Sequence, residues 1–143
     1  MKCKVSGKKI TPFMSFGKMP MANGFLDPQE FNDEFFYELE VGFSEDNFLF
    51  QVNDHPKSNK IFNDKYPFYT HKSNYMVNHF KDYFNWIKKS FIKTNSRILE
   101  IGSNDGTFLK NFKNESIEHL GFEPSKNVAD LSKKNGVNVL IKN

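Results

Sequence analysis

The feature that most constrains the fold of this chain is an alternation of short apolar runs and amphipathic segments in its C-terminal part. The runs RILEI, HLGFE and VNVLI occupy residues 97–101, 119–123 and 137–141, and their length and composition are typical of strands. Residues 107–112 and 125–134 lie between them and are predicted to be helices. Strands that alternate with helices form right-handed crossovers and a parallel sheet. The sequence therefore predicts an α/β fold with three parallel strands in this region.

A longer amphipathic segment precedes this alternation. Within residues 73–91 the apolar side chains recur at spacings of three and four, which places them on one stripe of a helix. These side chains are Met76, Phe80, Tyr83, Phe84, Ile87 and Phe91. We expect the stripe to pack against the α/β part of the chain.

The N-terminal part has a different period. Apolar residues alternate with polar ones over residues 35–43 and again over residues 48–52, and the turn-forming SEDN separates the two runs. Period-two alternation around a turn predicts a β-hairpin with one buried face. The polar, proline-containing residues 53–60 predict a loop or linker. We therefore divide the chain into a small N-terminal hairpin module, residues 1–58, and an α/β part, residues 59–143.

Charge and hydropathy argue against several classes of partner. The 20 basic and 17 acidic residues are scattered and leave a formal charge of +3, whereas nucleic-acid binding usually requires a clustered basic face. No apolar run is long enough to cross a bilayer or to form the core of a signal peptide. Cys3 is the single cysteine, which suits a reducing compartment. The sequence therefore predicts a soluble, cytoplasmic protein that binds neither nucleic acid nor a membrane.

The turn after the first predicted strand of the α/β part favours a ligand without phosphates. A dinucleotide site needs G-x-G-x-x-G, so that a pyrophosphate can lie against bare backbone. Here Gly102 and Gly106 are present, but the middle glycine is replaced by Asn104, and the acids Glu100 and Asp105 would repel an anion. An NAD-binding domain is therefore disfavoured. S-adenosylmethionine, which carries a sulfonium and an ammonium group, fits these acids better.

A second acid, Glu123, ends the next predicted strand. It follows Gly102 at close to the spacing of about 20 residues that nucleotide-binding units use between the glycine turn and the acid that holds the ribose. We expect its carboxylate to accept hydrogen bonds from both ribose hydroxyls, and to be solvated when the site is empty. A purely structural acid at the end of a strand is the alternative.

These motifs resemble those of one enzyme family. LEIGSNDGTFLKNF followed by GFEPSKNVA, with FGKMPMANGFL near the N-terminus, is similar to the S-adenosylmethionine-dependent C-methyltransferases that act on nucleotide-linked deoxysugars. The resemblance implies a small zinc-binding module followed by a Rossmann-like class I methyltransferase domain. It implies that the methionyl side of the cofactor is lined by Glu100, Gly102, Ser103, Asn104, Asp105 and Gly106. It implies that the ribose and adenine side is lined by Glu123, Pro124 and Ser125.

The chain departs from this family at the metal site. The family uses two C-x2-C pairs, and the matching positions here read Cys3, Ser6, Ser44 and Asn47. One thiolate with neutral oxygens neither matches the preference of zinc nor neutralises its charge. His55 or His71 could complete a site, but neither has zinc-ligand spacing from Cys3. We therefore predict that no metal is bound and that the hairpin persists as a packed aromatic module.

The second departure is length. The domain of the family has seven strands, and this chain supplies the first three, so we expect an N-terminal fragment that is inactive on its own. The alternative is a non-catalytic cofactor-binding or interaction module, or a truncated remnant. The resemblance places the region before the glycine turn over the active site, where it would contact a nucleotide-linked sugar. Its candidate catalytic residues are Tyr66, Tyr69, His71 and Tyr75, each with a structural role as the alternative, and Asn23 is a further candidate substrate contact.

Overall fold

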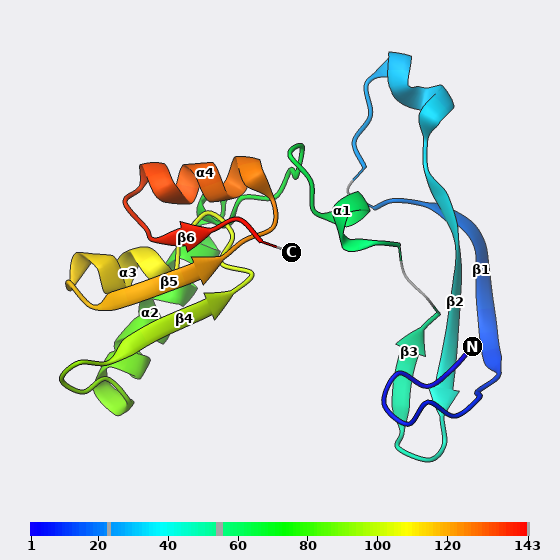
Figure 1. Cartoon of the computed structure of the whole chain (residues 1–143), viewed down its shortest axis with the longest axis horizontal. Helices are drawn as coiled ribbons and strands as arrows, with labels where there is room; N and C mark the ends of the chain where they lie inside the picture. The colour runs from blue at the N-terminus through cyan, green and yellow to red at the C-terminus, as the bar shows by residue number, and fades with distance from the viewer. Residues whose placement is uncertain (23, 54–55, 143) are drawn as a thin grey trace. The chain divides into compact units, whose positions relative to one another are not determined.

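The computed structural model describes residues 1–22, 24–53 and 56–142. The chain forms two compact units, Met1–Ile61 and Phe62–Asn143. Figure 1 shows an antiparallel sheet in the first unit and a parallel sheet with helices in the second. The predicted combination of a small hairpin module and an α/β part with three parallel strands is therefore confirmed.

The first unit is built on a three-stranded antiparallel sheet of order β1-β2-β3, formed by β1 (Pro12–Pro20), β2 (Phe36–Ser44) and β3 (Leu49–Val52). The β2–β3 pair is the predicted hairpin, with Val41 opposite Val52 and Ser44 opposite Leu49. A 3-10 helix, η1 (Pro28–Asp33), lies between β1 and β2, and a short helix, α1 (Ser58–Ile61), follows the sheet.

Strand β1 is not predicted by the sequence pattern. Its sequence, PFMSFGKMP, begins and ends with proline and contains a glycine, all of which weaken a strand pattern. The pairing of β1 with β2 also shifts register between Pro12 and Met14 and again between Ser15 and Lys18. These irregularities break the period-two alternation on which the prediction depends.

The second unit begins with a 3-10 turn, η2 (Thr70–Lys72), and the long helix α2 (Asn74–Ser90). Ser73 caps α2 by accepting a hydrogen bond from the Met76 amide at 3.3 Å. The strands β4 (Arg97–Ile101), β5 (Glu118–Phe122) and β6 (Val139–Leu140) then alternate with the helices α3 (Leu109–Asn114) and α4 (Lys126–Lys134). The strands pair in parallel in the order β4-β5-β6.

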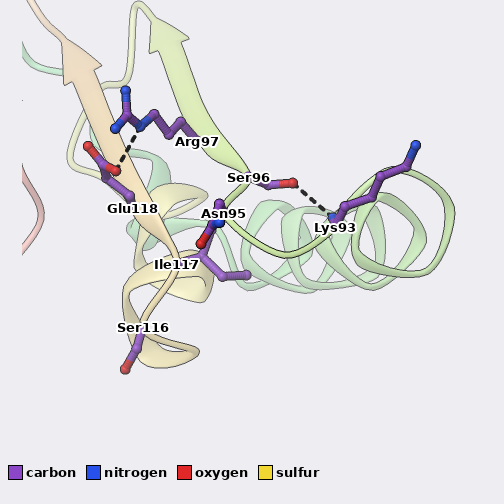
Figure 2. A pocket seen from close by; sticks show the side chains of 7 residues that line it. All are labelled: Lys93, Asn95, Ser96, Arg97, Ser116, Ile117 and Glu118. Carbon is purple, nitrogen blue, oxygen red and sulfur yellow. Dashed lines mark hydrogen bonds and ion pairs between the residues drawn. The ribbon is translucent and has the colours of Figure 1, made fainter.

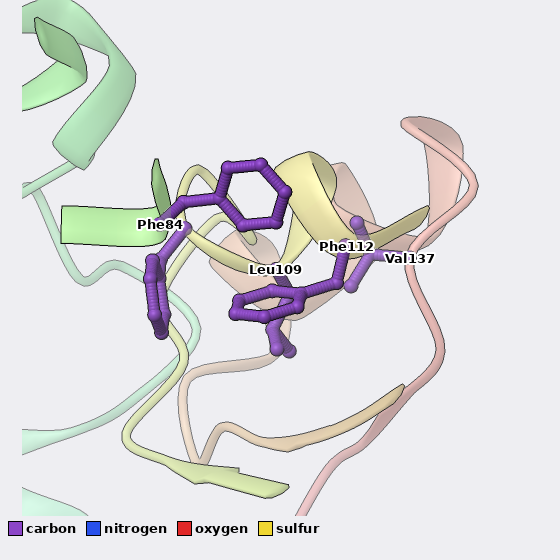
Figure 3. Close-up of a cluster of buried hydrophobic side chains, with 5 residues drawn as sticks. Phe84, Leu109, Phe112 and Val137 are labelled. Atoms are coloured by element: carbon purple, nitrogen blue, oxygen red, sulfur yellow. The ribbon is translucent and has the colours of Figure 1, made fainter. Parts of the chain in front are cut away.

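The core of this unit lies between the helices and one face of the sheet. Phe84 of α2 packs edge to face on Phe112 of α3, with ring centroids 4.9 Å apart. Phe108, Leu109 and Val137 complete the buried cluster, and Figure 3 labels four of its five members. Phe80 and Ile87 of α2 pack against it, so the predicted apolar stripe does dock on the α/β part. Tyr83 of the same stripe stacks on Phe108 of the core with ring centroids 5.3 Å apart, whereas Phe91 is 59% exposed.

Strand β4 forms an edge of the parallel sheet. Ile98 packs against the core, but Leu99 and Ile101, which alternate with it, are 60% and 84% exposed. Within the described residues, β4 pairs with β5 alone. No helix among the described residues is long and apolar enough to cross a membrane.

Candidate functional site

The glycine turn follows β4 at the carboxyl edge of the parallel sheet, where open α/β sheets bind their ligands. Gly102, Asn104 and Gly106 have positive φ angles of 75°, 49° and 75°, a backbone region that favours glycine. The amides of Gly102 and Ser103 donate to the Phe122 carbonyl at 2.8 and 3.0 Å. These two bonds hold the turn against the end of β5.

The two glycines of the turn serve different purposes. A Cβ atom on Gly106 would lie 2.4 Å from Ser132 Oγ and 3.1 Å from Val137 Cγ2, so this position must be bare for α4 to pack. A Cβ atom on Gly102 would meet no described atom within 4 Å. The backbone at Gly102 therefore faces open space, which a ligand could occupy.

Glu123 is buried beneath the turn, with 4% of its surface exposed. Its Oε2 accepts a hydrogen bond from the Asn104 amide at 2.9 Å, and its Oε1 accepts one from the Ser125 amide at 2.8 Å. The expectation that this carboxylate is solvated in the empty site is therefore wrong, because backbone amides replace water around it. Each oxygen keeps a second lone pair, so a ligand hydroxyl could still donate to the group.

Asn104 and Asp105 fasten the turn to the 66–72 segment, which comes before α2. Asn104 Oδ1 accepts from the amide and the hydroxyl of Thr70, both at 3.0 Å, and its Nδ2 donates to the Phe68 carbonyl at 3.1 Å. Asp105 Oδ2 accepts from the His71 amide at 2.9 Å and lies 2.7 Å from His71 Nδ1. The turn and the 66–72 segment thus form one hydrogen-bonded unit.

Asp105 is held in its ionised form by these contacts. Its other oxygen, Oδ1, accepts from the amide and the hydroxyl of Thr107 at 3.1 and 2.5 Å. Burial by itself would raise the pKa of Asp105, but the hydrogen bonds from His71 and Thr107 outweigh burial and lower it below the usual value. Asp105 is therefore a fixed negative charge beneath the turn.

Glu100 is the third acid of this group. Its Oε2 is buried, and no described residue donates a hydrogen bond to it. Burial, followed by the nearby charges of Asp105 and Glu123, raises the pKa of Glu100 from 4.5 to about 7. The turn therefore combines the fixed negative charge of Asp105 with a carboxyl, Glu100, whose ionised form a bound cation would stabilise, and it favours a cation over a phosphate.

The remaining predicted cofactor residues lie at the same edge. Ser103 and Ser125 are buried, and neither hydroxyl has a hydrogen-bond partner among the described residues. Ser125 stands at the N-terminus of α4 and Pro124 is half-buried beside it. Whether these residues contact a cofactor stays a prediction.

Three of the four predicted catalytic residues come together beside the turn. The rings of Tyr69 and His71 meet edge to face at 5.9 Å. Burial and the charge of Glu123 raise the pKa of Tyr66. Tyr75, in contrast, lies on the first turn of α2 and is 79% exposed, and no hydrogen bond joins it to the glycine turn within the described part of the chain.

The sequence analysis missed Asn127, whose Nδ2 donates to the Tyr66 carbonyl and to the Tyr69 hydroxyl, both at 2.8 Å. It therefore links α4 to the 66–72 segment by hydrogen bonds, in the same way that Thr70 links this segment to the glycine turn. Asn127 falls within the GFEPSKNVA motif, so a signal was present. Thr70 lies in the region expected over the active site, but nothing in the sequence indicates that its amide and hydroxyl bind Asn104.

An open pocket of about 650 Å³ lies elsewhere in the second unit (Figure 2). It is formed by the residues that precede β4 and β5, and the Arg97–Glu118 ion pair at 2.9 Å closes one side. This is the amino edge of the sheet, opposite to the glycine turn. Parallel sheets bind nucleotide-like ligands at the carboxyl edge, so we do not assign the candidate site to this pocket.

In the first unit, the four positions that match the zinc ligands of the family converge. Cys3 Sγ accepts from the Ser6 amide and from Asn47 Nδ2, both at 3.4 Å. Cys3 and Ser44 are buried. Hydrogen bonds from the side chain and the amide of Ser6 lower the pKa of the Cys3 thiol to about 6.

This donor set does not fit zinc, because a single thiolate among hydroxyls and an amide cannot replace four thiolates. No group of three or more His, Cys, Asp or Glu side chains that could hold a metal occurs among the described residues. Of the two histidines considered as additional zinc ligands, His55 lies outside the described residues and His71 pairs with Asp105 in the second unit. Asn23, the further candidate substrate contact, also lies outside the described residues. That the chain binds no metal stays a prediction.

Comparison with known proteins gives one family match. Residues 3–62 match the model of a methyltransferase-associated family described as "Putative zinc binding domain". The match covers the N-terminal unit, which is fewer than half of the residues of the chain. No curated protein matches the chain.

Two solved structures are similar to part of the chain. One is a methyltransferase from Thermotoga maritima, described as S-adenosylmethionine-dependent and as a possible histamine N-methyltransferase; it has 28% identity, a TM-score of 0.37, and coverage of 49% of this chain and 32% of its own. The other is an S-adenosylmethionine-dependent methyltransferase from Archaeoglobus fulgidus, with 20% identity, a TM-score of 0.36, and coverage of 50% and 35%. The chain therefore spans about a third of the length of these structures.

Proposed function

We propose that this chain is the N-terminal part of an S-adenosylmethionine-dependent methyltransferase. The observation that carries the proposal is a glycine turn that is open at Gly102 and surrounded by the carboxylates of Glu100, Asp105 and Glu123. A nucleoside with cationic centres complements this charge, whereas a pyrophosphate would be repelled. The family match of residues 3–62 supports the same class of enzyme.

The polar groups suggest how the cofactor would lie. The unpartnered Oε2 of Glu100 is suited to the ammonium group of the methionyl part, because a buried carboxylate oxygen is stabilised by a charged donor. Glu123 would accept the ribose hydroxyls through the lone pairs that the Asn104 and Ser125 amides leave free. The bare backbone at Gly102 would let the ligand approach between these two acids.

We further propose C-methylation of a nucleotide-linked deoxysugar as the reaction, on the strength of the sequence resemblance. S-adenosylmethionine would supply the methyl group. A base would remove the proton next to a sugar ketone, and the resulting carbanion would form a carbon–carbon bond to the methyl carbon while the carbon–sulfur bond breaks and its electron pair stays on sulfur as a neutral thioether. Asp105 holds Nδ1 of His71, which would orient Nε2 to take up a proton. Tyr69, whose ring meets that of His71 edge to face, and Tyr66 would supply tyrosine hydroxyls from the same segment.

The alternative is that these residues bind the cofactor without catalysis. The exposed Leu99 and Ile101 on the edge strand β4 are compatible with a chain that lacks the other wall of an active site. Both versions predict cofactor binding at the glycine turn, so binding is the first property to test.

The test compares two glycine variants that impose the same backbone cost. Gly102 and Gly17 have φ angles of 75° and 70°, and an added Cβ would meet no described atom within 4 Å at either position. We expect Gly102→Ala to abolish S-adenosylmethionine binding in calorimetry, and Gly17→Ala, which lies in β1, to leave it unchanged. NAD should not bind the wild type. Undiminished binding by Gly102→Ala would refute the assignment of the site.

A further inference from the structure

Two chain turns of similar design meet in the N-terminal unit. In the first, the Gly7 amide donates to the Cys3 carbonyl at 2.9 Å, and Gly7 has a φ angle of 71°. In the second, which joins β2 to β3, Phe48 has a φ angle of 57°. Each turn thus places a left-handed residue directly after the second of its two matched positions, Ser6 or Asn47. The two matched positions within each turn, Cys3 with Ser6 and Ser44 with Asn47, have the spacing of a C-x2-C pair.

The two turns are joined at Cys3. Its sulfur, in a residue that is 2% exposed, accepts from the Ser6 amide of its own turn and from Asn47 Nδ2 of the other, both at 3.4 Å. Asn47 Oδ1 in turn accepts from the Leu49 amide at 3.3 Å, which fixes the orientation of the Asn47 side chain. The Asn47 amide therefore bridges the thiol to the backbone of β3.

The fourth position, Ser44, is fully buried, and its side chain lies beside the Cys3 sulfur. The backbone thus keeps a convergence of four positions that the present side chains do not use for metal binding.

We propose that this module is a metal-independent version of a zinc knuckle, in which hydrogen bonds to the Cys3 sulfur join the two turns in place of a metal ion, while the backbone keeps a four-ligand geometry. Asn47 makes this connection at the Cys3 sulfur. The Lys8–Asp46 ion pair at 3.0 Å and the hydrogen bonds of Gln51 to Lys2 and Lys4, both at 2.9 Å, join the same segments, so the module can fold without metal. It follows that restoring thiols at the other three positions should restore zinc binding without redesign of the backbone.

The test uses the 143-residue chain and its triple variant S6C/S44C/N47C. After dialysis against a chelator, the wild type should contain no zinc, show no tetrahedral cobalt(II) absorption, and keep the same melting temperature with and without zinc. The triple variant should bind one cobalt(II) or zinc ion per chain and melt at a higher temperature when zinc is added. Stoichiometric zinc in the dialysed wild type would overturn the proposal. A triple variant that stays metal-free would overturn it as well.

A second variant keeps the proposal testable if the triple variant does not fold. Asn47→Ala removes the side chain that donates to the Cys3 sulfur, and its melting temperature in metal-free buffer should fall by about 3–5 °C. The control is Asn32→Ala, at an exposed asparagine of η1 in the same unit, and its melting temperature should stay unchanged. An Asn47→Ala variant as stable as the wild type would show that the thiol does not join the turns.

Discussion

Replacing Glu100 by glutamine should stabilise the unliganded protein and weaken cofactor binding. Glu100 Oε2 is buried without a described partner, and burial together with the charges of Asp105 and Glu123 raises its pKa to about 7. Glutamine has nearly the same shape and no charge, so Glu100→Gln removes the cost of ionising this group near two other carboxylates. The same change removes the negative charge that a cationic ligand would need.

The size of the effect follows from proton linkage. The pKa rises from 4.5 in the unfolded chain to about 7 in the folded one, and one unit corresponds to about 1.4 kcal/mol, which gives a ceiling of about 3 kcal/mol. The side chain is only partly removed from water, so we expect about 1–2 kcal/mol. The contribution of Glu100 to stability should be largest below pH 4.5, decrease as the pH rises to about 7, and change little above it.

The assay is urea unfolding of the wild type and Glu100→Gln at pH 5 and pH 8. The variant should be the more stable protein at pH 8, and its advantage should be much smaller at pH 5, where the folded wild type keeps its proton. Glu118→Gln is the control, because Glu118 forms an exposed ion pair with Arg97 and exposed pairs contribute about 0–1 kcal/mol. An advantage of the same size at both pH values, or a variant less stable than the wild type at pH 8, would refute the reasoning.

Three further predictions concern the acids and the core. Glu123→Gln should weaken S-adenosylmethionine binding about tenfold or more in calorimetry, and should also lower the free energy of unfolding in urea by about 1–3 kcal/mol, because an amide oxygen cannot accept from both backbone amides that the carboxylate binds. Full stability with lost binding would contradict the second part. Asp105→Asn should release the 66–72 segment, which NMR would detect as faster hydrogen exchange of the His71 amide, with the Phe91 amide of α2 as an unchanged reference. Phe112→Ala should cost about 3–5 kcal/mol in urea unfolding, because its ring is fully buried, and a cost below about 1 kcal/mol would show that the core is not packed as described.

The sequence predicted most of the secondary structure of the second unit, because local patterns decide it. The helix expected at residues 73–91 is Asn74–Ser90, and the strand expected at residues 97–101 is Arg97–Ile101. The last strand is shorter than predicted, Val139–Leu140 instead of residues 137–141. Val137 instead joins the core cluster with Phe84 and Phe112, and an apolar run does not distinguish a core contact from a ladder position.

In the first unit, strand β1 was not predicted, because its local sequence pattern also fails to indicate its tertiary pairing. Its two prolines and Gly17 argue locally against a strand, and its pairing with β2 tolerates them only through two register shifts. A ladder between distant segments depends on the partner strand, so the sequence of one strand does not reveal it.

For the candidate site, too, the sequence and the tertiary structure determine different properties. Sequence alone determined the types and spacing of its residues: the acids at the ends of two parallel strands and the glycines of the turn. It also shows that Cys3 is the single thiol among the four positions that match the zinc ligands of the family that the chain resembles. Only the tertiary structure decided the state of each group. It buried Glu123 beneath two backbone amides, paired Asp105 with His71, and left Glu100 without a described partner. The physical reason is that burial and hydrogen-bond partners come from segments far apart in the chain, and these set the charge and the pKa of a side chain whose identity the sequence already contains.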